Sequence, residues 1–445
     1  MDEISKGTLV IPFEISKVLT YLLALSIPWS VEWSFGKFNI NAISEFVLVA
    51  SFISLIIQVE FWNFLKKEIL QNWISRVLAL FWLIMAISIL FSAFPLVSLK
   101  YVIISGLSIM VFFFGLCYLA SKENIIFKRV ILIYLFSFIP LIIYSWIHHY
   151  QYDFRMDVSV MVSRPFIKNH AIYSACVLML FFMTLSFEFL PGRAKMNRLW
   201  KGLILFFFLV ALYFSFSRAA WMVFIAVMVF YGLVHLIKLS LGKWLTLIVG
   251  VILLVGISTI WMLNAGMGNE SISKSGLPQE HLRSSLNVKT DVSNLERINR
   301  YKCALRMIGD RPIFGFGVGT FQFAYLDYQR EEDMTRLSVI KPDNDGLPHH
   351  SGRGGEAHSE YFGNLAEMGL IGFLMWMLLV IFSMYSGLKT VISRKFENRN
   401  HHLPLSFLGV ITCFYMLSLV NDFWQVEEVL FLFMCGLAGV NKEAV

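Results

Sequence analysis

Long apolar runs alternate with short polar connections over most of this chain. A helix needs about 20 apolar residues to cross a bilayer, and runs of roughly that length recur throughout. They lie near 15–30, 43–60, 74–93, 100–120, 130–147, 171–190, 202–217, 219–237, 244–263, 362–386, 405–421 and 424–440. The pattern predicts an all-α polytopic membrane protein with about twelve transmembrane helices.

One polar stretch, 264–361, interrupts this pattern and separates helices in 1–263 from helices in 362–445. Within it, apolar residues at helical spacing predict a short amphipathic helix that Asp310-Arg311-Pro312 ends. The predicted apolar face is Leu295, Ile298, Tyr301, Leu305 and Ile308. Residues 314–319 then alternate glycine with apolar residues, which predicts a turn or a tight packing site. Because this loop has no anchoring role, we expect the chemistry there.

Composition supports a membrane protein. Of 445 residues, 57% are hydrophobic and 15% are charged, whereas soluble proteins are about a quarter charged. The net charge of +7 comes partly from basic residues in alternate short loops, a pattern that orients membrane proteins and does not require nucleic acid. By the positive-inside rule, both termini are cytoplasmic and the long loop faces the opposite side. The first apolar run lacks a basic flank and a small-residue cleavage site, so we expect it to be retained as a helix.

Histidines near the end of the long loop raise two hypotheses. His349, His350, Glu356 and His358 do not have the spacing of a helical metal site, so no metal is expected. His358 differs because it directly precedes a predicted helix and lies beside Glu356 and Glu360. An imidazole there could accept a proton from a hydroxyl nucleophile, or it could be an ordinary interfacial histidine.

Arginines on the predicted loop face indicate an anion site. Arg218 lies between two apolar runs, where an arginine is costly unless it is paired or faces water; the alternative is snorkelling to lipid headgroups. Arg297 and Arg300 lie in the long loop, and guanidinium groups suit phosphate oxygens. The 148–170 loop adds further cations, among them Arg164 and Lys168. On the same side lie three acids that could pair with these cations or form a solvated helix start: Asp422, Glu427 and Glu428.

These motifs, in this order, resemble those of the O-antigen ligase family. The resemblance rests on Ser217-Arg218, Arg297, Gly315 to Gly319, Ala357-His358 and Glu367-Met368-Gly369-Leu370-Ile371-Gly372. A twelve-helix architecture with a large periplasmic loop is similar as well, and the family-like region covers about 200–380. The family includes lipopolysaccharide O-antigen ligases, some polysaccharide polymerases and bacterial protein O-oligosaccharyltransferases.

The resemblance implies a glycosyltransferase of the bacterial inner membrane, with its active site on the periplasmic face. It would move a glycan from undecaprenyl diphosphate to a hydroxyl of lipid A-core, among membrane lipids and without a cofactor or metal. Arg218 and Arg297 would hold the diphosphate, and His358 would serve the acceptor hydroxyl as a base or by orienting it. Further diphosphate contacts are expected from Arg300, Arg164 and Lys168, and support from Glu367, Glu360 and Tyr301, where the family often has Trp.

Alternatives remain open at this point. An O-antigen or exopolysaccharide polymerase, or a protein O-oligosaccharyltransferase, would differ from the ligase only in its acceptor. A polysaccharide transporter is the alternative outside enzymes, and it predicts ionisable residues near helix midpoints and repeated halves. In this chain the ionisable residues gather towards one membrane face and no internal repeat is visible.

Overall fold

The structure is a computed structural model that describes residues 2–35, 38–41, 43–186, 198–236, 292–335, 338–339, 355–393 and 402–443. In these ranges helices make up the fold, together with one short antiparallel hairpin of β1 (Glu32–Phe35) and β2 (Phe38–Asn41). The helices are α1 (Asp2–Ser26), α2 (Ser44–Ile56), α3 (Val59–Gln71), α4 (Trp73–Ser88), α5 (Pro95–Ser108), α6 (Leu116–Lys122), α7 (Asn124–Tyr150), α8 (His170–Ser186), α9 (Arg198–Phe214), α10 (Arg218–Leu236), α13 (Val292–Asp310), α14 (Phe321–Ala324), α15 (Glu360–Ser393), α16 (His402–Leu417) and α17 (Glu427–Glu443).

A multi-pass membrane architecture is confirmed. Segment 244–263 lies outside the described residues. The other predicted segments coincide with helical structure, although 43–60 crosses the break between α2 and α3. In the described part of the chain, four helical spans are long and apolar enough to cross a membrane, or five if α2 and α3, bent by 90°, form one span. Helices α8, α9, α10 and α16 are apolar but shorter. The number of twelve, the orientation of the termini and the boundaries of the long loop stay predictions.

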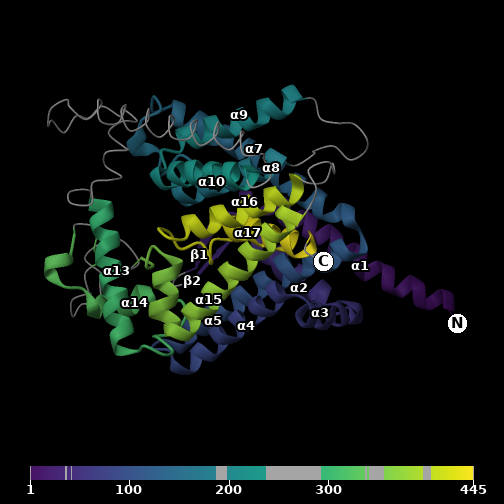
Figure 1. Cartoon of the computed structure of the whole chain (residues 1–445), viewed down its shortest axis with the longest axis horizontal. Coiled ribbons are helices and arrows are strands. Elements are labelled where there is room, and N and C mark those ends of the chain that lie inside the picture. Colours follow the sequence, from purple (N-terminus) through teal and green to yellow (C-terminus); the bar gives the residue numbers. More distant parts are fainter. Residues whose placement is uncertain are drawn as a thin grey trace.

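The helices form a bundle in which α16 and α17 lie between two groups of neighbours (Figure 1). Helix α16 packs on α8 and α17, and α15 packs on α4. Buried aromatic rings hold the centre together: the rings of Trp376 and Trp424 meet edge to face at 5.7 Å, and those of Phe414 and Phe433 stack at 3.8 Å. Helices α13 and α14 lie at one end of the bundle, against α15 (Figure 1).

Helix α13 confirms the helix predicted in the long loop, and it ends at Asp310 as expected. The predicted apolar face, however, is only partly buried. Cys303 and Met307 are fully buried, whereas Leu305 is 53% exposed. The buried face also carries Glu296 and Arg300, whose carboxylate and guanidinium groups pair at 3.0 Å. Because the two charges compensate each other, polar residues occupy a face that hydrophobicity alone assigns to solvent.

The predicted tight packing site is confirmed at the glycine-rich turn, which lies against a break in α15. Gly315 and Gly369 adopt φ values of 65° and 64°, a region that favours glycine. A Cβ atom on either residue would lie 2.4 Å from backbone atoms of the opposite segment. The backbone hydrogen bonds between the segments run from Phe316 N to Ala366 O (3.1 Å), Gly317 N to Glu367 O (2.7 Å) and Leu370 N to Pro312 O (2.8 Å).

Candidate functional site

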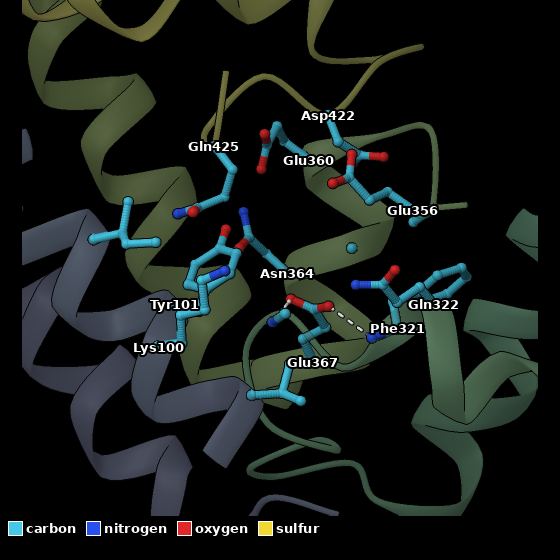
Figure 2. Close-up of a pocket in the computed structure, with 15 residues that line it drawn as sticks. Lys100, Tyr101, Phe321, Gln322, Glu356, Glu360, Asn364, Glu367, Asp422 and Gln425 are labelled. Carbon is cyan, nitrogen blue, oxygen red and sulfur yellow. Dashed lines mark hydrogen bonds between the residues drawn. The ribbon is translucent and has the colours of Figure 1, made fainter. Parts of the chain in front are cut away.

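Residues 356–360, just before and at the start of α15, lie where α13 and a cavity come together. On one side they contact α13, and on the other they border a cavity of about 300 Å³. Figure 2 shows four carboxylates around this cavity, drawn from α15, the segment before it and the connection between α16 and α17. They belong to Glu356, Glu360, Glu367 and Asp422.

Glu360 and Asp422 join the start of α15 to the α16–α17 connection. Glu360 Oε1 accepts hydrogen bonds from the backbone N–H groups of Phe423 (2.7 Å) and Trp424 (2.6 Å). In return, Asp422 Oδ1 accepts from the N–H group of Ser359 at 3.0 Å. These reciprocal bonds satisfy buried donors and fix the segment that carries His358.

Glu367 holds the glycine-rich turn in place from within α15. Its Oε2 atom accepts a hydrogen bond from the N–H group of Gly319, and its Oε1 atom accepts one from Phe321, both at 2.8 Å. The carboxylate therefore positions the turn that forms one wall of the cavity. This geometry is consistent with the supporting role that the sequence indicated for Glu367.

A basic side faces the same segment from α13. The Nη1 atom of Arg300 donates to the carbonyl oxygen of Glu356 at 2.6 Å, while its Nε atom bonds Glu296. Arg297 is half-buried on the same helix, close enough to His358 to influence its pKa. Lys168 lies within electrostatic range of Glu356. The contacts of Arg300 favour a positioning role, and its assignment to the diphosphate stays a prediction.

His358 follows Glu356 and Ala357, which line the cavity, and its own backbone has a constrained conformation. Its φ is 54°, which is uncommon for a residue other than glycine. Its carbonyl oxygen accepts a hydrogen bond from the hydroxyl group of Tyr301 at 3.1 Å, and this ring stacks on Phe362. Burial, reinforced by Arg300 and Arg297, lowers the pKa of His358 to about 3. The imidazole is therefore neutral at physiological pH.

The pKa values of two of the acids, Glu356 and Asp422, are raised. Desolvation raises the pKa of Glu356, against the opposing effect of Lys168 and Arg300. The Glu356 side chain is solvent-accessible and lines the cavity, where surrounding protein replaces part of its water. Desolvation and then the nearby Glu356 and Glu360 carboxylates raise the pKa of Asp422 well above its ordinary value. Like charges crowded together favour the protonated form in this way.

The other predicted site residues lie around this centre with less defined roles. Arg218 is half-buried at the N-terminus of α10, where the helix dipole adds to its positive potential. The Nε atom of Arg164 donates to the carbonyl oxygen of Lys168 at 3.1 Å and so shapes the loop that carries this lysine. That Arg218 and Arg164 join Arg297 at one diphosphate stays a prediction. His349 and His350 lie outside the described residues.

Several residues of the cavity wall could not be predicted from the sequence, because they come from separate helices and connections. Lys100 and Tyr101 come from α5, Asn364 from α15 and Gln425 from the α16–α17 connection. One signal was available: Lys100 and Asn364 are polar residues at the edges of apolar runs, and such residues near a membrane face indicate function. The pattern alone did not show that the two runs meet.

Comparison with known proteins identifies one family. No curated protein matches the chain. Residues 203–377 match the family model described as O-antigen ligase. The match covers α9, α10, α13 and the first half of α15, and thus includes Arg218, Arg297 and His358. Members of this family are glycosyltransferase-like ligases and polymerases that use lipid-linked glycans. By this match, residues 203–377 of the multi-pass membrane chain belong to the O-antigen ligase family.

Proposed function

We propose that the protein is a metal-independent glycosyltransferase of the bacterial inner membrane that ligates O-antigen to lipid A-core. It would take the glycan from undecaprenyl diphosphate on the periplasmic face. The observation that carries this proposal is the family match over residues 203–377, together with basic groups on α13 and the Lys168 loop that flank His358 beside a polar cavity.

The reaction moves the glycan from a phosphate oxygen to a hydroxyl oxygen. The bond between the anomeric carbon and the diphosphate breaks, and negative charge grows on the phosphate oxygens. Arg297 and Arg218 stabilise this charge, and Lys168 adds a further positive potential. Preorganised groups of this kind contribute about 2.7–4 kcal/mol each to lowering a barrier. The acceptor hydroxyl attacks from the side of His358.

A neutral imidazole suits a role in orienting the acceptor. Because the pKa of His358 is about 3, its unprotonated ring nitrogen is available to accept a hydrogen bond throughout the neutral range. The Tyr301 contact and the Asp422 bond to Ser359 fix the backbone on both sides of the ring. His358 would thus hold the acceptor hydroxyl at the anomeric carbon.

Deletion of the gene tests the reaction class directly. A ligase predicts long glycan retained on the lipid carrier and bare lipid A-core on a gel of surface glycans. Core that carries a single repeat would instead assign the chain as a polymerase. Normal lipopolysaccharide beside unglycosylated secreted proteins would assign it as a protein O-oligosaccharyltransferase. Unchanged glycans in every fraction would contradict a glycosyltransferase.

Arg297→Ala tests the assignment of the diphosphate site. We expect transfer to fall about 10²–10³-fold, because one charge-stabilising donor is lost in the transition state. Complementation of the deletion strain, followed by the same gel, measures the loss. Arg330→Ala is a matched control, since this side chain is 62% exposed and pairs only loosely with Glu332, at 3.5 Å. Full activity of Arg297→Ala would exclude this arginine from the diphosphate site.

A further inference from the structure

The cavity beside His358 has the features of a site for a polyhydroxylated ligand. Its volume of about 300 Å³ lies at the lower end of the range for small-molecule sites, roughly 300–1,000 Å³. Its wall combines carboxylates with side-chain amides and two aromatic rings, those of Tyr101 and Phe321 (Figure 2). Carboxylates and amides offer acceptors and donors to hydroxyl groups.

A metal ion does not explain the four acids. Within the described ranges, which include all four, no three His, Cys, Asp or Glu residues are placed to share a metal ion. The carboxylates surround the space instead of converging on one point (Figure 2). Glu360 and Glu367 already use carboxylate oxygens to hold backbone N–H groups. Glu360 and Glu367 therefore stabilise the cavity wall, and the other acids are left to contact a ligand.

Asn364 supplies an independent sign of a ligand. Its side chain is 94% buried, as its exposed fraction is 6%, and it lines the cavity. Among the residues that the structure describes, its Nδ2 atom has no hydrogen-bond partner, although buried amide groups are almost always paired. Figure 2 places this amide in the middle of the cavity, between Glu360 and Glu367. The group is thus available to donate to an oxygen of a bound sugar.

Glu356 is the acid best placed to act on such a ligand. Its side chain is exposed to the cavity, and in the described part of the chain only its backbone carbonyl oxygen accepts a hydrogen bond, from Arg300. Arg300 fixes this backbone, so the carboxylate is anchored beside His358 while its oxygens stay unoccupied. In Asp422, by contrast, one carboxylate oxygen accepts a hydrogen bond from the N–H group of Ser359.

We propose that this cavity binds the acceptor sugar and that the Glu356 carboxylate takes the proton from the attacking hydroxyl. The inference rests on the proposed function and deepens it. The hydroxyl oxygen forms the new bond to the anomeric carbon, and its proton passes to Glu356. The bond from that carbon to the diphosphate oxygen breaks, and its electron pair leaves with undecaprenyl diphosphate. Glu356 later releases the proton to water, so no other reactant is needed.

The pH dependence of transfer follows from this assignment. A carboxylate accepts a proton only when it is ionised, so activity falls as the pH drops through the pKa of Glu356. Desolvation raises this pKa, which moves the acid limb above the ordinary value of 4.5. His358, with a pKa of about 3, is too weak a base to produce such a limb. The ionisable groups that surround Glu356 are His358, Glu360, Glu367, Asp422, Lys100, Tyr101, Lys168 and Arg300.

The full-length protein in proteoliposomes, with an undecaprenyl-diphosphate glycan as donor and lipid A-core as acceptor, tests the inference. We expect Glu356→Gln to lower kcat about 10²–10⁴-fold, the usual contribution of a general base, with donor binding within about twofold of the unaltered chain. Glu356→Asp keeps a carboxylate and should keep both partial activity and the acid limb. Formate should restore part of the activity of Glu356→Ala, which a merely structural role would not allow. Glu331→Gln, on an exposed 3₁₀ turn, is the matched control.

Each outcome has one meaning. Near-normal kcat in Glu356→Gln overturns the inference and leaves the proposed function standing. A pH profile of the unaltered chain without an acid limb above 4.5 does the same, and this measurement does not depend on a variant that folds. Absence of transfer by the unaltered chain to lipid A-core overturns the proposed ligase function, and this inference with it.

Discussion

The basic side on α13 and the acidic cavity under α15 meet at residues 356–360, yet they use charge in opposite ways. On α13, Arg300 is paired with Glu296, and its remaining hydrogen bond holds the Glu356 backbone. In the cavity, carboxylates crowd together, and desolvation and like charges raise the pKa values of Glu356 and Asp422. The difference shows that pairing hides charge on α13, whereas crowding in the cavity favours protonated acids; our proposals give the first region to the diphosphate and the second to the acceptor.

The largest expected effect comes from breaking the buried Glu296–Arg300 pair of α13, whose arginine also holds the Glu356 backbone. Glu296→Ala leaves Arg300 as an uncompensated charge that is only 5% exposed. We expect a loss of about 3–5 kcal/mol in the free energy of unfolding, as is usual when one partner of a buried pair is removed. Thermal unfolding in detergent measures the change.

Glu332→Ala is the matched control for that variant. It removes an exposed partner of Arg330, at 3.5 Å, and surface pairs contribute only about 0–1 kcal/mol. Similar melting temperatures for the two variants would show that the Glu296–Arg300 pair does not hold α13 to the cavity.

A smaller effect is expected from the acid that forms the cavity wall. Glu367→Gln replaces one of two backbone acceptors with an NH₂ group, which faces the N–H group of Gly319 or Phe321. An unsatisfied buried donor costs about 1–3 kcal/mol, and thermal unfolding should show this loss. Glu331→Gln, exposed to solvent, should stay within about 0.5 kcal/mol of the unaltered chain. Unchanged stability of Glu367→Gln would mean that the turn is held by the backbone hydrogen bonds alone.

The effect of His358 concerns pH and is distributed over several pH units. Its folded pKa of about 3 lies below the ordinary value of 6.5. Below pH 6.5 the unfolded chain takes up a proton that the folded chain does not, so stability falls as the pH falls. The expected slope is about 1.4 kcal/mol per pH unit until the pH approaches 3. Unfolding of the protein and of His358→Gln between these values should show that the variant loses this part of the slope.

The sequence predicted where helices and turns lie better than it predicted which side of a helix is buried. The end of α13 at Asp310 and the packing of the glycine-rich turn could be predicted, because capping, proline and glycine act locally. The most buried face of α13 could not be predicted, because hydrophobicity does not reveal that Glu296 and Arg300 neutralise each other. Motif order indicated His358 and Arg297, whereas Lys100 and Asn364 required knowledge of which helices meet.

By itself, the sequence determined that this chain is a multi-pass helical membrane protein, and it predicted that the chemistry lies in one polar loop. Long apolar runs leave a helix as the solution that satisfies the backbone in lipid, whatever the tertiary contacts are. Only the tertiary structure decided that α5, α15 and the α16–α17 connection enclose an acidic cavity next to α13. Desolvation and like charges at that junction depend on distances between segments far apart in sequence, and these determine how Glu356, His358 and Asp422 hold protons.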